Sequence, residues 1–163
     1  MSGFFRGMIA AGFGGQGIMV LGQLVAYTAI SEGRHVTWIP SYGPEMRGGT
    51  ANCGVAISDE EIASPVVAEA DVTVIMNNPS MERFEGSVKP GGLLVYNSDL
   101  VKYPNPRKDV TIFPIPAHSV ALALGSDKVS NIVVLGAIVE ATDLVGLEAC
   151  IETIKDKLGK RKP

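Results

Sequence analysis

A chain of 163 residues suits one domain, and its 46% hydrophobic and 19% charged residues exclude an intrinsically disordered protein, because this much apolar surface can form a packed core. The formal net charge of −3, with basic residues clustered only at Lys160, Arg161 and Lys162, argues against a nucleic-acid partner. Two distant cysteines, Cys53 and Cys150, exclude a zinc ribbon or a cysteine-ligated iron–sulfur cluster within this chain alone, and we expect no metal site.

The N-terminal segment lacks the pattern of a targeting or membrane-spanning segment. The apolar run before Gly12 is short, and Arg6 interrupts it, so we expect neither a signal peptide nor a membrane span. Two thiols in an otherwise ordinary composition favour a reducing environment. We therefore expect a cytoplasmic protein without a membrane partner.

The first forty residues predict a strand, a helix and a second strand. Residues 8–11 are apolar and run into Gly12, which is typical of a buried strand that enters a turn. Residues 17–29 are apolar and free of proline, and they favour a buried helix that stops at Gly33. Residues 35–39 are rich in β-branched and aromatic side chains and predict the second strand.

The rest of the chain continues this alternation of buried strands and helices. Asn77-Asn78-Pro79 is a turn and helix-start signal. Strands are predicted at 50–57, 72–76, 93–96 and 110–113, and helices at 117–124, 131–141 and 147–157. No linker divides residues 1–163, which we take as a single domain. The pattern predicts an α/β protein, a Rossmann-like three-layer sandwich with a mostly parallel central sheet.

A glycine-rich turn lies between the first predicted strand and the first helix. The sequence Gly12-Phe13-Gly14-Gly15-Gln16-Gly17 matches G-x-G-x-x-G in the context that this motif requires. We expect the first glycine to permit a tight turn, the second to let backbone approach a ligand, and the third to allow close packing of helix on strand. Backbone N–H groups at the helix start can hold an anion. The predicted cofactor-binding residues are Gly12, Gly14, Gly15, Gln16 and Gly17; an equal alternative is that these glycines serve only the turn and its packing.

Dinucleotide binding is disfavoured by the residues that follow. NAD sites place an acidic residue at the end of the second strand, where this chain has Trp38-Ile39-Pro40-Ser41. NADP has weak support, because Arg34 precedes that strand instead of following it. No Gly-Lys-Ser/Thr follows the glycines, so the turn is not a P-loop.

A second unusual loop covers residues 41–50 and should lie at the same edge of the sheet as the glycine turn. Its arginine suits a carboxylate or a phosphate, and its tyrosine offers a flat face and a hydroxyl. We favour a binding role over a solvated surface loop, because loops commonly carry binding residues. The predicted partner- or ligand-contacting residues are Tyr42, Glu45, Arg47, Gly48, Gly49, Thr50 and Asn52.

No catalytic residue is predicted. With only two histidines, His35 and His118, no Ser/His/Asp or Cys/His set can be assembled. We expect His118, near a predicted helix start, to be a surface or capping residue. Cys53 lies in a predicted strand, where a buried and inert thiol is the simplest interpretation.

The sequence resembles the gamma subunits of 2-oxoacid:ferredoxin oxidoreductases over essentially the whole chain. The glycine turn alone would be weak evidence, but it is followed in order by Gly43-Pro44-Glu45-Met46-Arg47-Gly48-Gly49-Thr50-Ala51-Asn52-Cys53, Ile115-Pro116-Ala117 and Asn131-Ile132-Val133-Val134-Leu135-Gly136-Ala137. The loop is most similar to those of the 2-oxoglutarate or branched-chain type. Pyruvate is a less favoured substrate, and related domains also serve indolepyruvate oxidoreductases.

The resemblance implies a subunit of an enzyme that decarboxylates a 2-oxoacid oxidatively, forms an acyl-coenzyme A and reduces ferredoxin. It implies partner alpha and beta subunits, and in some enzymes a delta subunit, which hold thiamine diphosphate, Mg²⁺ and iron–sulfur clusters, with coenzyme A as cosubstrate. Ferredoxin would then be only an indirect partner, and the isolated chain could form a homodimer through the surface meant for those partners.

Two departures from the family pattern stand out. His118 occupies a position that usually holds a small or acidic residue, and the family usually continues beyond residues 158–160, so we expect a C-terminal segment to be missing here. Two alternatives to the subunit interpretation stay open. One is a free-standing regulatory module that binds a mononucleotide or another anion, and the other is a purely structural subunit.

Overall fold

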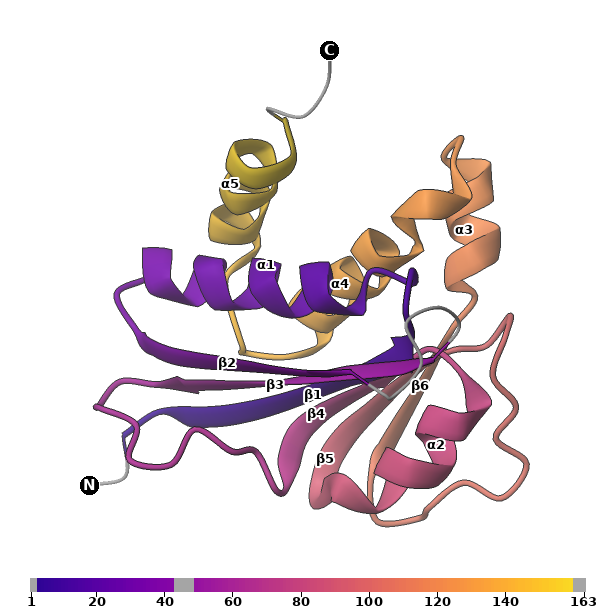
Figure 1. Cartoon of the computed structure of the whole chain (residues 1–163), viewed down its shortest axis with the longest axis horizontal. Helices are drawn as coiled ribbons and strands as arrows, with labels where there is room; N and C mark the ends of the chain where they lie inside the picture. The colour runs from indigo at the N-terminus through magenta and orange to yellow at the C-terminus, as the bar shows by residue number, and fades with distance from the viewer. Residues whose placement is uncertain (1–2, 43–48, 160–163) are drawn as a thin grey trace.

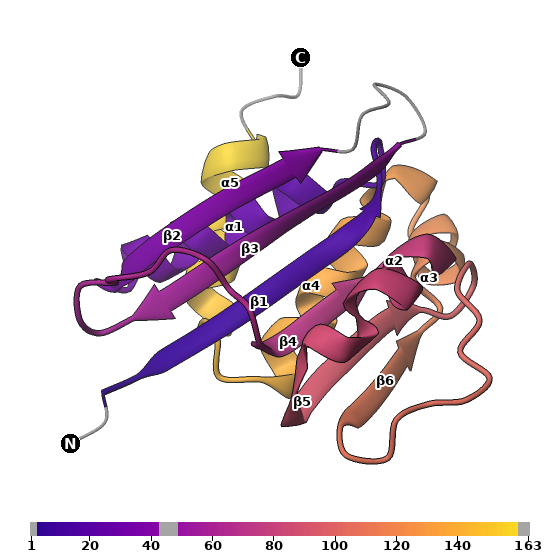
Figure 2. The ribbon, with the colours of Figure 1, turned by 60° about the horizontal axis from the view of Figure 1, so that its bottom comes forward.

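A six-stranded sheet with helices on both faces forms the described part of the protein, residues 3–42 and 49–159 of the computed structural model (Figure 1). The strands are β1 (Phe5–Phe13), β2 (His35–Tyr42), β3 (Thr50–Ser58), β4 (Ala70–Ile75), β5 (Val88–Asn97) and β6 (Thr111–Ile115). They lie in the order β2-β3-β1-β4-β5-β6, which can be followed in Figure 2. β3 is antiparallel to both β1 and β2, and the remaining pairs are parallel. The predicted Rossmann-like α/β fold with a mostly parallel sheet is confirmed.

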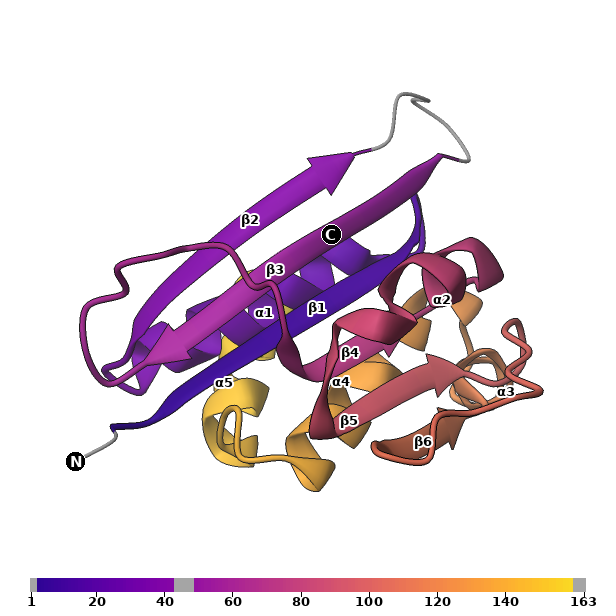
Figure 3. The ribbon, with the colours of Figure 1, turned by 90° about the horizontal axis from the view of Figure 1, so that it is seen from below.

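The helices form two unequal layers. One face of the sheet carries α1 (Ile18–Ser31), α3 (Ala117–Ala123), α4 (Ser130–Ala141) and α5 (Leu147–Leu158), whereas the other face carries α2 (Asn78–Phe84) (Figures 1 and 3). Short 3₁₀ turns, η1 (Glu85–Ser87) and η2 (Asp127–Val129), precede β5 and α4. α2 lies over β1 and β4, so β2 and β3 have no helix on that side in the described residues (Figure 3).

The centre of the sheet is buried from both sides, which explains the apolar character of β1. Six consecutive residues of this strand, 7–12, are buried, because helices cover both faces and strands flank both edges. α1 packs on β1, β2 and β3 with one side and on α4 and α5 with the other. It is therefore apolar on most of its circumference, and Leu21, Leu24 and Val25 are almost completely buried.

The antiparallel insertion of β3 brings the second loop to the glycine turn. β2 and β3 form a hairpin in which Tyr42 pairs with Ala51, and β3 pairs with β1 so that Phe13 lies opposite Thr50. The end of β2 and the start of β3 therefore lie beside the end of β1. The direction of β3 could not be predicted from its composition, because small residues fit either orientation.

Among the described residues, no helix is both long and apolar enough to cross a lipid bilayer.

Candidate site at the carboxyl ends of the parallel strands

The glycine turn and the second loop meet at one edge of the sheet, as predicted for the part of the loop that is described. The Gly14 amide donates a hydrogen bond to the carbonyl oxygen of Gly49, at 2.9 Å. This edge is where the parallel strands end, and the chain leaves β1 towards β2 on one side and returns through β4 on the other. In open α/β sheets, ligands bind in the crevice at such a reversal.

The glycines of the turn have different roles. Gly15 and Gly17 have positive φ angles of 95° and 76°, which disfavour residues with a Cβ atom. Gly12 instead lies inside β1, where a Cβ would come within 2.5 Å of the Gln16 side chain and 2.9 Å of Cβ of Met76. Gly12 therefore precedes the turn, which begins at Gly14, and the absence of a Cβ leaves room for the Gln16 side chain. The expectation that Gly12 permits the tight turn stays a prediction.

The Gln16 side chain holds the turn against the neighbouring strand. Its Oε1 accepts a hydrogen bond from the Phe13 amide at 2.6 Å, and its Nε2 donates to the Met76 carbonyl at 3.0 Å. Both ends of the amide thus bind the protein's own backbone. Gln16 positions the turn in this structure, and its predicted contact with a cofactor stays a prediction.

A residue of α4, far away in the sequence, packs against the end of the glycine turn. The Asn131 Nδ2 donates to the Gly17 carbonyl at 3.2 Å, and the Asn131 side chain lies where a Cβ on Gly17 would have to go. In the sequence, Asn131 stood out only as part of a family motif, and this contact was missed. Residues 114 positions apart give no local signal of a contact.

A small cavity of about 140 Å³, here called the glycine-turn cavity, lies behind the turn. Its lining combines residues that follow or end parallel strands with residues of η2 and the start of α4: Gly15, Gln16, Met76, Asn97, Leu100, His118, Asp127, Lys128 and Ser130. His118, expected to be a surface or capping residue, lines this cavity. Asn97 and Lys128 were missed, although Asn97 directly follows a predicted strand and so belonged at the edge where ligands bind.

The predicted residues of the second loop are spread apart. Tyr42 ends β2 and is 69% exposed, whereas Asn52 lines a separate small groove on the sheet face opposite α1. Gly49 makes the bond to the turn, and Thr50 begins β3. Three other predicted residues, Glu45, Arg47 and Gly48, lie outside the described residues.

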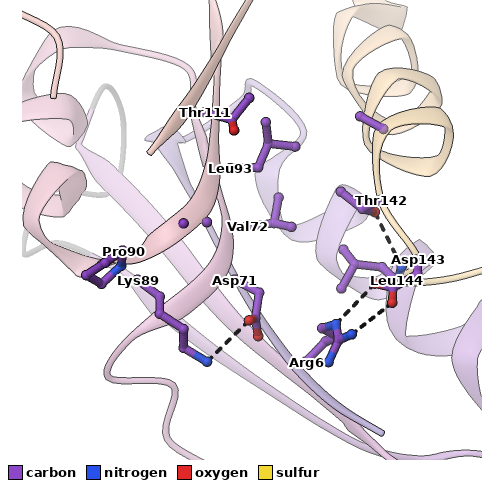
Figure 4. A pocket seen from close by; sticks show the side chains of 13 residues that line it. Arg6, Asp71, Val72, Lys89, Pro90, Leu93, Thr111, Thr142, Asp143 and Leu144 are labelled. Carbon is purple, nitrogen blue, oxygen red and sulfur yellow. Dashed lines mark hydrogen bonds and ion pairs between the residues drawn. The ribbon is translucent and has the colours of Figure 1, made fainter. Parts of the chain in front are cut away.

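A larger cavity, of about 630 Å³, lies at the opposite end of the strands (Figure 4). Its charged side chains are engaged with one another or with backbone. Arg6 forms two hydrogen bonds with Asp143, at 2.9 and 3.1 Å, and Lys89 lies 3.2 Å from Asp71, which also accepts a bond from the Gly7 amide. This arrangement fastens the start of β1 to β5 and to the α4–α5 connection, and it offers a ligand no unpaired charge.

Cys53 agrees with the expectation of a buried, inert thiol. Its side chain is fully buried beneath α1, and burial raises the pKa of the thiol from 9.0 to about 11. The thiolate is the reactive form, so Cys53 is unreactive near neutral pH.

The sequence of this chain is similar to those of known oxidoreductase subunits. Residues 7–162 match the pyruvate ferredoxin/flavodoxin oxidoreductase family. The 2-oxoglutarate synthase subunit KorC of Methanocaldococcus jannaschii is 35% identical over 92% of this chain and 82% of its own length. The ketoisovalerate oxidoreductase subunit VorA of Methanothermobacter marburgensis is 39% identical over 91% of this chain, but the chain spans only 30% of that relative.

The fold of this chain is also similar to solved structures of such oxidoreductases. The whole chain superposes, with a TM-score of 0.90 and 27% identity, on 28% of a chain of the 2-oxoglutarate:ferredoxin oxidoreductase from Magnetococcus marinus with 2-oxoglutarate, coenzyme A and succinyl-CoA bound. The gamma subunit of a keto/oxoacid ferredoxin oxidoreductase from Geobacter sulfurreducens matches 94% of this chain and 86% of its own, with a TM-score of 0.81 and 30% identity. The resemblance inferred from the glycine turn and the later motifs is confirmed, and the chain belongs to the pyruvate ferredoxin/flavodoxin oxidoreductase family.

Proposed function

We propose that this chain is the gamma subunit of a 2-oxoacid:ferredoxin oxidoreductase and acts only in assembly with larger subunits. The observation that carries this proposal is the superposition of the whole chain on part of an enzyme with 2-oxoglutarate, coenzyme A and succinyl-CoA bound. The reaction would be oxidative decarboxylation of a 2-oxoacid to an acyl-coenzyme A with reduction of ferredoxin. Alpha, beta and, where present, delta subunits would supply thiamine diphosphate, Mg²⁺ and the iron–sulfur clusters.

The role proposed for this chain is to present the glycine-turn edge to coenzyme A and to the catalytic subunits. The first turn of α1 has no side-chain cap and no acidic residue, so its N–H groups and the positive end of the helix dipole are available to an anion. Phe13 and Tyr42 lie at the same edge and are 37% and 69% exposed. Exposed aromatic side chains of this kind commonly become buried when subunits associate.

The proposed substrate is 2-oxoglutarate or a branched-chain 2-oxoacid. KorC and VorA, which are named for 2-oxoglutarate and ketoisovalerate, are 35% and 39% identical to this chain. The gamma subunit common to the pyruvate and ketoisovalerate oxidoreductases of Thermococcus litoralis is 29% identical. Pyruvate is therefore a less favoured substrate, although specificity would be determined by the thiamine-binding subunits.

Co-purification tests the proposal. A tagged copy of the chain is purified anaerobically from its native cell, and the eluate is assayed for coenzyme A-dependent dye reduction with 2-oxoglutarate, 3-methyl-2-oxobutanoate, pyruvate and indolepyruvate. Larger subunits together with activity on one 2-oxoacid would support the proposal and identify the substrate. A chain recovered alone and without activity would contradict it.

A second candidate is a free-standing module that binds a mononucleotide or another anion. It rests on the exposed glycine turn, which belongs to this chain without help from a partner. Calorimetry with ATP, NAD and coenzyme A separates the two candidates, because a mononucleotide-binding module should bind ATP in preference to coenzyme A.

A further inference from the structure

We propose that the outermost strand β6 and the helix α3 that follows it form a surface on which a larger subunit of the assembled enzyme docks. This surface, here called the β6–α3 surface, consists of five exposed side chains: Phe113, Pro114, Val120, Leu122 and Leu124. The inference rests on the function proposed above, because it requires that larger subunits exist. It adds a second contact area to the glycine-turn edge and gives its chemical character.

Charged side chains are absent from this part of the sequence. Residues 110–126, which span β6 and α3, contain no Asp, Glu, Lys or Arg, although 19% of all residues in the chain are charged. The core of a protein–protein interface is depleted of charged residues, whereas a surface in permanent contact with water is rich in them. The composition of this stretch therefore fits a contact surface better than a solvated one.

α3 has more apolar side chains than the described fold buries. In this seven-residue helix only Ala117 and Ala121 are buried, and the helix packs on α4 and η2 at the outer end of its layer (Figure 1). Val120, Leu122 and Leu124 are 38%, 54% and 72% exposed. A helix with apolar side chains on most sides is normally enclosed by protein. α3 therefore lacks part of the protein environment that its sequence fits.

β6 ends the sheet and has an edge with little protection against another chain. Its neighbour in the described residues is β5, and four of its five residues are at least partly exposed, with Phe113 at 41%. Edge strands that face water usually carry charges, which prevent another chain from pairing with them. β6 has no charge, and Pro114 is its only feature that opposes pairing. An uncharged edge beside an exposed phenylalanine is typical of a strand that a partner covers.

The lengths of the relatives favour a larger subunit as this partner. The chain spans only 30% of VorA from Methanothermobacter marburgensis and 28% of the chain from Magnetococcus marinus. In those proteins a domain like this one is part of a much longer polypeptide, so it stays with the remainder permanently. Permanent interfaces are more apolar than transient ones, which agrees with the β6–α3 surface. The partner that fits this surface is a subunit equivalent to that remainder, with an uncharged apolar surface of its own.

Leu122→Lys and Leu124→Lys test the surface in the assembled enzyme. Tagged wild type and variants are purified anaerobically from the native cell, and the larger subunits that co-purify are quantified. A lysine within an apolar contact loses its hydration without gaining a partner, so recovery of the larger subunits should fall about tenfold or more. Ile30→Lys is the matched control and should leave recovery unchanged, because Ile30 is 55% exposed and lies, like Leu122, in the last turn of its helix.

The possible results of this experiment separate the surface from the function. Normal recovery with both leucine variants would overturn the β6–α3 surface and leave the subunit function standing. A loss with Ile30→Lys as large as that with Leu122→Lys would also overturn it, because the effect would not be specific to this surface. A wild-type chain that recovers no larger subunit would contradict the proposed function itself. The melting temperatures of the purified variants should equal that of wild type, since the replaced side chains are exposed and a cation is favourable near a helix C-terminus.

Hydrogen exchange provides a test that needs no variant. Amide exchange in residues 110–126 is compared between the purified wild-type chain and the assembled wild-type enzyme. Exchange should be slower in the assembled enzyme, because a docked subunit removes β6 and α3 from water. Equal exchange rates in the two samples would refute the proposed surface even if the lysine variants fail to fold.

The oligomeric state of the isolated chain distinguishes a larger subunit from a second copy of this chain. Sedimentation is measured for purified wild type and Leu124→Lys. A monomer, or a dimer that Leu124→Lys leaves intact, agrees with a larger subunit on the surface. A dimer that Leu124→Lys dissociates also agrees if the variant loses the larger subunits, because the isolated chain then pairs through a surface left uncovered. The same dissociation with undiminished recovery of the larger subunits would assign the surface to a second copy and overturn the proposal.

Discussion

The side-chain amide of Asn131, in the first turn of α4, donates a hydrogen bond to the Gly17 carbonyl at the start of α1, over a distance of 3.2 Å. The same side chain occupies the space that a Cβ on Gly17 would need. The two residues are therefore fitted to each other. Asn131 requires the absence of a side chain at Gly17, and Gly17 has its carbonyl satisfied by Asn131. This contact connects the glycine turn to the helix that packs behind it.

Gly17→Ala should destabilise the protein by about 2–4 kcal/mol. Two costs add up to this figure: alanine is strained in the left-handed backbone conformation at this position, and its Cβ would collide with the Asn131 side chain. Urea unfolding of the purified chain measures the change. Gly33→Ala is the matched control, because Gly33 also has a positive φ, 83°, but has open space around its Cβ position. A loss at Gly33 as large as that at Gly17 would show that the Asn131 contact contributes nothing.

Gln16→Ala should lower the free energy of unfolding by about 1–3 kcal/mol, because it removes the acceptor of the Phe13 amide and the donor to the Met76 carbonyl. Gln16→Glu keeps the acceptor for Phe13 but places a carboxylate oxygen against the Met76 carbonyl, so it should be destabilising as well. Chemical denaturation of both variants tests this account. Unchanged stability together with weakened coenzyme A binding would instead make Gln16 a ligand residue.

Cys53 should make the protein sensitive to alkaline pH. Burial raises the pKa of this thiol from 9.0 to about 11 in the folded state, so the folded protein favours the protonated form. The contribution of this thiol to the free energy of unfolding is fully present below pH 9. It is lost as the pH rises towards 11, and the whole loss amounts to about 2–3 kcal/mol. Unfolding free energies measured between pH 8 and 11 give the slope.

Cys53→Ala is the control for this slope, because burial also raises the pKa values of Cys150 and Tyr103, which titrate in the same direction. The variant should lose stability less steeply above pH 9 than wild type does. A wild-type slope in Cys53→Ala would assign the alkaline transition to the other groups.

Gly136→Ala should stabilise the isolated chain by about 0.5–1 kcal/mol, since Gly136 lies in the interior of α4, is exposed, and has open space within 4 Å of the position that a Cβ would take. Thermal unfolding measures the gain. The same substitution in the assembled enzyme reports on the surface of α4. Weakened assembly despite a more stable chain would indicate that a larger subunit packs closely against Gly136.

The sequence by itself determined most elements and their class. Runs such as residues 8–11 and 72–76 are apolar without alternation, because their strands are covered on both faces, and that pattern survives without tertiary information. The predicted helices agree with α1, α3, α4 and α5 to within a residue or two. Proline or glycine marks the ends of α1, α3 and α5. Position in the chain also identified the glycine turn, which must follow a strand and precede a helix.

Only the tertiary structure decided the direction of β3, the position of Gly12 inside a strand and the composition of the glycine-turn cavity. Strand direction depends on which neighbour offers hydrogen bonds, and the small residues of β3 carry no preference. Asn97, His118 and Lys128 come together because separate strand ends and a 3₁₀ turn converge at one edge. Contacts over such sequence separations are set by packing of the whole sheet, so no local pattern can encode them.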